Sequence, residues 1–363
     1  MRIELVKRKN SSTTMAVLSP VIAVILTLIS GAILFAIAGK DPIHGLYLFF
    51  IQPLTDSWSI QELIVKATPL VLIACGLAVC YLSNNWNIGA EGQFIFGALC
   101  GSFLPILFPD FDNWLTLPLM LVFGTLGGAL WGLIPGVLKT RFNTNEILTS
   151  LMLVYVASLL LDYLVRGPWR DPDGYNFPES RIFSDSATMP LIDGRLSVSC
   201  LVAVAVVIVL ALMLSKSLKG FEIRVMGESP RAGGFSGFSQ KGLTLFSFAI
   251  AGGLAGLAGT MEVSSSLNQL LPSISPGYGF TAIIVAFLGR LNPIGILIAG
   301  LVLSLSYIGG ESVQASMGIS SKIASVIQGL LLCYVLVCDT FVLYQIRIVS
   351  TLRSGAQKEA SDV

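Results

Sequence analysis

The residues that could bind a solute are few, and most of them lie between long apolar runs. A polar insert at 84–93 separates two such runs and contains Asn85, Asn87, Glu91 and Gln93. Carboxamide and carboxylate groups at membrane depth should face a cavity or a partner, so this insert is a candidate lining for a polar pathway. An ordinary tight turn capped by asparagines would use the same residues, and the sequence alone leaves both interpretations open.

A second polar and aromatic segment follows near position 277. Tyr278 and Phe280 alternate with glycines in the run Ser-Pro-Gly-Tyr-Gly-Phe (275–280), and Glu262 closes the apolar run before it. Aromatic side chains next to a break in a helix can hold a polar solute by stacking and hydrogen bonding, and Glu262 would line the mouth of the same pathway. Tyrosine is equally typical of an anchor at a membrane boundary.

The sequence predicts no metal site, no bound cofactor and no enzymatic activity. His44 is the one histidine, and the six cysteines are spread through apolar runs without the spacing of a zinc site. The glycine-bearing run 237–242 does not match GxxxxGK[ST], the phosphate-binding loop of nucleotide hydrolases. A net charge of +1 argues against nucleic acid as a partner.

The elements that must position these residues are membrane helices. Hydrophobic residues make up 54% of the 363 and charged residues 12%, a balance far too apolar for a soluble domain. Backbone polar groups must be paired internally in hydrocarbon, so long apolar runs should cross it as helices. We therefore expect an all-α, polytopic membrane protein with about ten transmembrane helices. The predicted spans are 15–37, 68–82, 94–108, 115–138, 147–165, 197–214, 243–261, 280–288, 293–308 and 323–344.

Lysine and arginine predict the orientation. Ten crossings put both termini on one side, and that side carries most of the basic residues, so the N- and C-termini are expected in the cytoplasm. The stretch 15–37 is longer than the roughly 7–15 apolar residues of a cleaved signal, and we expect it to remain as the first span. The predicted organisation is a cytoplasmic N-terminal segment at 1–14, a membrane domain at 15–345 and a cytoplasmic tail at 346–363. The membrane domain contains an extracytoplasmic loop at 166–196 and a cytoplasmic loop at 215–241.

The cytoplasmic loop 215–241 contains a candidate docking segment. Pro230 is placed to begin a short helix with Ser229 as its cap, and Arg231 and Phe235 would be exposed on it. Such a helix suits a partner protein, although a basic loop that only fixes topology would look similar. In the span 243–261, four glycines (Gly252, Gly253, Gly256 and Gly259) predict close packing against neighbouring helices.

Five short motifs together resemble the permease subunits of bacterial ABC importers for simple sugars and nucleosides, a family related to branched-chain amino acid permeases. They are Asn-Ile-Gly-Ala-Glu-Gly-Gln (87–93), Asn-Glu-Ile-Leu (145–148), Gly-Phe-Glu-Ile-Arg (220–224), Gly-Leu-Ala-Gly-Leu-Ala-Gly (253–259) and Gly-Tyr-Gly-Phe (277–280). The resemblance covers nearly the whole chain. It departs at position 233, where the family usually has alanine and this chain has Gly233.

The resemblance implies a multi-pass subunit of the bacterial cytoplasmic (inner) membrane that forms the pathway for a nucleoside or simple sugar. It implies four kinds of partner: a second permease chain (related or identical), ATP-binding cassette subunits that use ATP and Mg²⁺, an extracytoplasmic binding protein or lipoprotein, and the lipid bilayer. The ATPase subunits would dock on a coupling loop. Its expected residues are Gly220, Phe221, Glu222, Arg224, Gly227, Pro230, Arg231, Ala232 and Phe235.

Two other classes compete with this interpretation. A self-sufficient secondary transporter or channel would need ionisable residues inside spans, for which Asp162 and Asp339 are the candidates. An intramembrane enzyme would need a nucleophile with a base or a metal site, and the sequence offers no such set.

Overall fold

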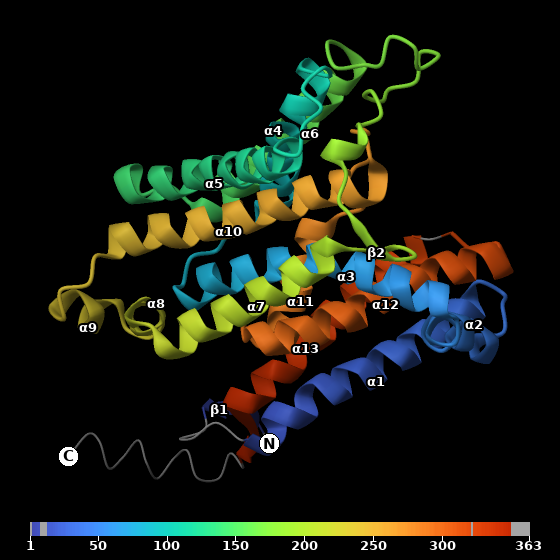
Figure 1. Cartoon of the computed structure of the whole chain (residues 1–363). Helices are drawn as coiled ribbons and strands as arrows, with labels where there is room; N and C mark the ends of the chain where they lie inside the picture. The colour runs from blue at the N-terminus through green and yellow to red at the C-terminus, as the bar shows by residue number, and fades with distance from the viewer. Residues whose placement is uncertain (1, 8–12, 321, 350–363) are drawn as a thin grey trace. The chain divides into compact units, whose positions relative to one another are not determined.

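The computed structural model describes residues 2–7, 13–320 and 322–349, which are mostly helical (Figure 1). The helices are α1 (Thr13–Ile37), α2 (Pro42–Phe50), α3 (Ser57–Leu82), α4 (Ala90–Leu107), α5 (Thr116–Phe142), α6 (Glu146–Arg166), α7 (Val198–Lys216), α8 (Leu218–Glu228), α9 (Pro230–Phe235), α10 (Gln240–Glu262), α11 (Tyr278–Leu288), α12 (Pro293–Met317) and α13 (Lys322–Leu343). The short elements are β1 (Arg2–Lys7), η1 (Gln52–Leu54), η2 (Asp185–Ala187), β2 (Leu191–Asp193), β3 (Leu196–Ser197), the π-helical turn η3 (Val263–Leu267) and β4 (Tyr344–Val349).

The prediction of an all-α membrane protein is confirmed. Each predicted span falls on a helix, and seven of the described helices have the length and hydropathy of a crossing: α3, α4, α5, α6, α7, α10 with η3, and α12. Helix α11 has 11 residues and rises about 16 Å, roughly half the thickness of a hydrocarbon core. The total of ten crossings and the side of the termini stay predictions.

Helix α3 begins eleven residues earlier than the sequence predicted, at Ser57 instead of Thr68. Asp56 caps this end by accepting a hydrogen bond from the Ser59 N–H at 3.3 Å. The extra turns contain Glu62 and Lys66, which looked like loop residues in the sequence. Both are paired in the structure, with Arg195 and Glu311 respectively, so the charged side chains do not oppose the helix. The predicted cytoplasmic loop 215–241 contains α8 and α9, of which the sequence predicted only α9, and the side of the membrane on which it lies stays a prediction.

The chain divides into two compact units, Met1–Tyr47 with Val313–Val363, and Leu48–Ser312. In the first unit α1 packs against α13, with the hydroxyls of Ser30 and Tyr334 2.6 Å apart. Strands β1 and β4 pair antiparallel in the same unit. Residues 350–363 of the predicted tail lie outside the described part of the chain.

Helix α10 is the centre of the second unit, where α3, α4 and α5 pack around it (Figure 1). The contact is so close that a Cβ atom on Gly128 of α5 would lie 2.3 Å from the Gly252 carbonyl oxygen. A Cβ atom on Gly97 of α4 would lie 2.1 Å from the Gly256 Cα. The hydroxyl of Thr260 adds a hydrogen bond to the Gly97 carbonyl at 3.2 Å. The predicted small-residue packing of this helix is confirmed.

The loop 166–196 is fastened to the segment that follows α10. Backbone N–H groups of Phe183 and Met189 donate to the carbonyls of Asn268 and Ser264 at 2.9 and 2.8 Å. The Ser180 N–H donates to the Leu270 carbonyl at 3.0 Å. The loop therefore fixes the path of the chain between the end of α10 and the start of α11.

Candidate substrate pathway and coupling surface

Glu91 caps the N-terminus of α11. It lies in the first turn of α4, is buried, and its Oε2 accepts a hydrogen bond from the Gly279 N–H at 2.6 Å. Ser275 is a second hydrogen-bond partner of the carboxyl group. An acidic group is favourable here because the first N–H groups of a helix have no partner within it. Close approach of the two helices requires Gly279, whose added Cβ would lie 2.2 Å from the Glu91 backbone nitrogen.

Asn87 and Gln93 form a reciprocal amide pair. The Asn87 Nδ2 donates to Gln93 Oε1 at 3.1 Å, and the Gln93 Nε2 donates to Asn87 Oδ1 at 3.2 Å. Both side chains are buried, and the Asn87 carbonyl also accepts from the Tyr81 hydroxyl at 3.0 Å. The pair pins the loop between α3 and α4 onto the start of α4. In this conformation both amides are occupied by protein partners.

Asn85 belongs to a different group of contacts. Its Oδ1 accepts a hydrogen bond from the Lys139 Nζ at 2.9 Å, and its Nδ2 donates to the Ser83 hydroxyl at 2.8 Å. It therefore faces the end of α5 and not the Glu91 cap. The sequence insert 84–93 contributes to three distinct local arrangements.

Glu262 and Tyr278 lie together where α10 ends and α11 begins. Glu262 is 8% exposed, and the Tyr278 side chain is its hydrogen-bond partner. The charged groups that act on Glu262 are Lys66, Glu62 and Arg195. A carboxylate beside a phenol hydroxyl, with cations close by, can hydrogen-bond the hydroxyl groups of a neutral solute.

Aromatic rings surround Tyr278. The ring of Phe94 on α4 lies 6.0 Å from it edge to face, and the ring of Tyr307 on α12 lies 5.8 Å away. The Tyr307 hydroxyl is 2.8 Å from the Thr281 hydroxyl. Phe280 lies two residues beyond Tyr278, on a different side of α11, and is exposed. The structure thus brings Glu262 and Tyr278 together and leaves Phe280 apart.

Two ion pairs near Glu262 were not predicted from the sequence. Arg195, in the turn between β2 and β3, binds Glu62 at 3.0 and 3.3 Å and lies 5.7 Å from the centre of the Trp58 ring. Lys66, one helical turn after Glu62, binds Glu311 at 3.1 Å. The available signal was an acid and a base four residues apart on one helix face, which favours helix. It was lost because α3 was predicted to begin after both.

The coupling segment, α8 with α9, lies at one end of the second unit between α7 and α10 (Figure 1). Ser229 precedes α9 and Pro230 starts it, as predicted. Six of the expected docking residues are exposed, and Phe235 is 96% exposed. These exposed residues are Phe221, Arg224, Pro230, Arg231, Ala232 and Phe235.

The other expected coupling residues face the protein. A Cβ atom on Gly220 would lie 2.5 Å from the Leu214 carbonyl oxygen, and one on Gly227 would lie 1.9 Å from the Leu82 carbonyl oxygen. Glu222 is paired with Lys219 at 2.8 Å. The inward glycines therefore seat α8 against α7 and α3, while the outward residues form an exposed surface.

A bundle of apolar helices with polar and aromatic groups at a helix break, and with a helical segment exposed at one end, is typical of a membrane transport protein. Residues 59–336 match the family described as "Branched-chain amino acid transport system / permease component", and the chain belongs to this family. It is the permease subunit of an ABC importer and a multi-pass protein of the inner membrane.

Three curated relatives are similar over most of their length. The glucose ABC transporter permease protein TsgB13 of Haloferax volcanii is 33% identical, over 98% of this chain and 96% of that protein. The nucleoside ABC transporter permease protein NupB of Lactococcus lactis is 30% identical, over 90% and 92%. The guanosine ABC transporter permease protein NupP of Bacillus subtilis is 28% identical, over 88% and 92%. The resemblance inferred from the five motifs is confirmed.

Proposed function

We propose that this chain forms the translocation pathway for a nucleoside or simple sugar, in an importer whose ATP is hydrolysed by a separate subunit. The observation that carries the proposal is the buried carboxylate and phenol pair, Glu262 and Tyr278, at the break between α10 and α11. Relatives that span nearly the whole chain are named for glucose, nucleoside and guanosine transport. All three names point to neutral solutes rich in hydroxyl groups.

The chemistry of the site suits such a solute. Sugar hydroxyls can donate to the Glu262 carboxylate and accept from tyrosine hydroxyls, while aromatic faces pack against a sugar ring or a base. Asn85, Asn87, Glu91, Gln93 and Phe280 complete the proposed pathway. The hydrogen bonds that the polar residues of this set make within the protein, and the one between Glu262 and Tyr278, would have to open as the permease changes conformation, because a solute must replace a buried hydrogen bond to bind there.

Energy comes from partner subunits in this proposal. Two ATP-binding cassette subunits dock on the exposed residues of α8 and α9, and they bind the ATP and Mg²⁺, so this chain carries no cofactor and no ATPase site. A second permease chain completes the pathway, and an extracytoplasmic binding protein or lipoprotein delivers the solute. Exposed arginine and phenylalanine side chains, such as Arg231 and Phe235, are residues typical of protein interfaces.

The test is uptake into liposomes that contain this chain with its second permease chain, its cognate ATPase subunits and the receptor. We expect accumulation of labelled guanosine or glucose only when the ATPase subunits are present and ATP is supplied on the side of the membrane where they are docked. Binding of nucleosides and sugars to the receptor then identifies the solute. ATP-independent accumulation, or no accumulation of any nucleoside or sugar that the receptor binds, would contradict the proposal.

A self-sufficient secondary transporter is the second candidate, and one observation disfavours it. Asp162, a possible ion-coupling residue, is 45% exposed in its side chain and paired with Arg166 one turn later at 2.7 Å. A solvent-exposed pair at a helix end is a poor coupling site. The side chain of Asp339 lies outside the part of the chain that the structure describes. Uphill uptake by this chain alone would favour the secondary transporter.

A further inference from the structure

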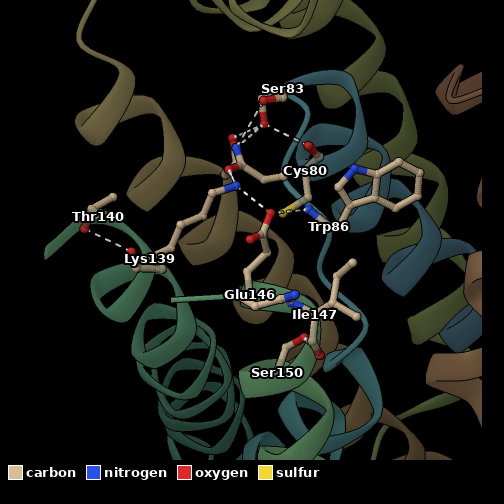
Figure 2. Close-up of polar contacts among 12 residues, drawn as sticks. Cys80, Ser83, Trp86, Lys139, Thr140, Glu146, Ile147 and Ser150 are labelled. Carbon is tan, nitrogen blue, oxygen red and sulfur yellow. Dashed lines mark hydrogen bonds and ion pairs between the residues drawn. The ribbon is translucent and has the colours of Figure 1, made fainter. Parts of the chain in front are cut away.

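An ion pair closes the turn between α5 and α6. Lys139 lies in the last turn of α5, Glu146 lies in the first turn of α6, and the Lys139 Nζ is 2.5 Å from the Glu146 Oε1. Figure 2 shows the two side chains pointing toward one another from their helices. Their side chains are 23% and 15% exposed, so the pair is largely shielded from water. Removing one partner of a shielded ion pair destabilises a protein more than removing one partner of an exposed pair, because the remaining charge is left without solvation.

The same pair holds the loop between α3 and α4. The Lys139 Nζ also donates to Asn85 Oδ1, and the Glu146 Oε1 accepts from the Trp86 N–H at 3.5 Å. Asn85 donates in turn to the Ser83 hydroxyl, which is 2.9 Å from the Ser247 hydroxyl of α10. Lys139 therefore joins α5, α6 and the loop directly (Figure 2), and Ser83 joins the same loop to α10.

The coupling segment contacts this network from one side. The α8 residue Gly227 packs against the carbonyl of Leu82, the residue just before Ser83. Both groups line one small cavity of about 30 Å³: Ser83, Asn85 and Lys139 from the network, Met226 and Pro230 from the coupling segment. A shift of α8 or α9 therefore meets the α3–α4 loop directly.

The loop leads to the pathway on the other side. Within a few residues of Asn85 it reaches the Asn87–Gln93 pair and then Glu91, which caps α11. The Ser150 hydroxyl of α6 accepts from the Ile88 N–H at 3.2 Å, so α6 steadies this part as well. The loop is short and hydrogen-bonded along its length, so displacement at one end is passed to the other.

We propose that Lys139, held by Glu146, fixes the α3–α4 loop through Asn85, so that a shift of the coupling segment moves this loop as one unit and with it the Glu91 cap of α11. Lys139 acts as a positioning residue and touches neither solute nor ATP. The inference rests on the proposed function, because it needs an ATPase docked on α8 and α9. In this proposal the Lys139–Glu146 pair links the movement that ATP hydrolysis causes in α8 and α9 to the opening of the pathway.

The test compares the assembled complex in liposomes, with wild-type protein, Lys139→Met, Glu146→Gln, and the conservative variant Lys139→Arg. Uptake and ATP hydrolysis are measured in the same vesicles. Lys139→Met and Glu146→Gln should continue to hydrolyse ATP while solute transported per ATP falls about tenfold. Lys139→Arg keeps the charge and the N–H donors and should retain most of the transport. Arg166→Met, which breaks an exposed pair at the far end of α6, is the matched control and should transport normally.

A second readout separates coupling from folding. Amide hydrogen exchange in residues 84–89 should change when a nonhydrolysable ATP analogue binds the wild-type complex, and Lys139→Met should abolish that change. Normal transport per ATP in both Lys139→Met and Glu146→Gln would overturn the proposal. If Lys139→Met fails to assemble, the comparison rests on Glu146→Gln and Lys139→Arg, and equal transport per ATP in these two variants also overturns it. Wild-type complex that does not transport with ATP counts against the proposed function instead.

Discussion

Two alanine substitutions on one helix test whether α10 packs as closely as the structure shows. Gly253 and Gly256 are three residues apart, and both lie in the interior of α10. A Cβ atom on Gly256 would lie 2.3 Å from the Gly124 carbonyl oxygen and 2.8 Å from the Gly128 Cα. A Cβ atom on Gly253 would meet Thr125 Cγ2 at 3.5 Å, which is ordinary contact.

The magnitude follows from these distances. Ordinary contact begins at 3.4 Å, so Gly256→Ala must push α5 away from α10 by about 1.1 Å. A gap of that size removes roughly a quarter to a half of the dispersion attraction between the atoms that face it. Overpacking of this kind costs about 1–3 kcal/mol. Replacing a glycine in a helix by alanine gains about 1 kcal/mol at either position. We expect Gly256→Ala to be destabilised by up to about 2 kcal/mol and Gly253→Ala to be at least as stable as wild type.

The assay is thermal unfolding of the purified protein in detergent, followed by tryptophan fluorescence. At about 2 °C per kcal/mol for a chain of this size, Gly256→Ala should melt up to about 4 °C below wild type. Gly253→Ala should melt at or slightly above it. Equal melting temperatures for the two variants would show that α5 and α10 are not in backbone contact, and the reasoning would fail.

Three further predictions concern the pathway and the coupling surface. Glu262→Gln should lower uptake about tenfold or more, because it removes the buried carboxylate that accepts from solute hydroxyls, while pull-down of the ATPase subunits stays unchanged. Arg231→Asp should weaken that pull-down by reversing an exposed charge on α9; normal association would count against docking there. Gly234→Ala should leave transport intact, since a Cβ there meets nothing within 4 Å. At Gly233 it would lie 2.2 Å from the Met226 sulfur, so Gly233→Ala requires that flexible side chain to move and should reduce transport more than Gly234→Ala. Equal uptake by the two alanine variants would show that Met226 moves freely.

The helical spans could be predicted from the sequence because a lipid bilayer restricts the structures that a chain can form inside it. Hydrocarbon forces apolar runs to become helices, and the ten predicted spans all fall on helices in the structure. The start of α9 followed from local chemistry, because Ser229 and Pro230 are the cap and first residue of the helix. The glycines of α10 predicted that it packs closely, although not against which helices. Both signals lie within one short segment, so they can be read from the sequence.

Only the tertiary structure decided which polar side chains meet. Asn85, Asn87 and Glu91 stand within seven residues of one another, yet they bind Lys139, Gln93 and the Gly279 N–H, respectively. Glu62 and Lys66 belong to a helix and not to a loop because Arg195 and Glu311 reach them from more than one hundred residues away. The energy of a hydrogen bond or ion pair depends on its partner and on its shielding from water, and for these residues both come from distant segments of the chain.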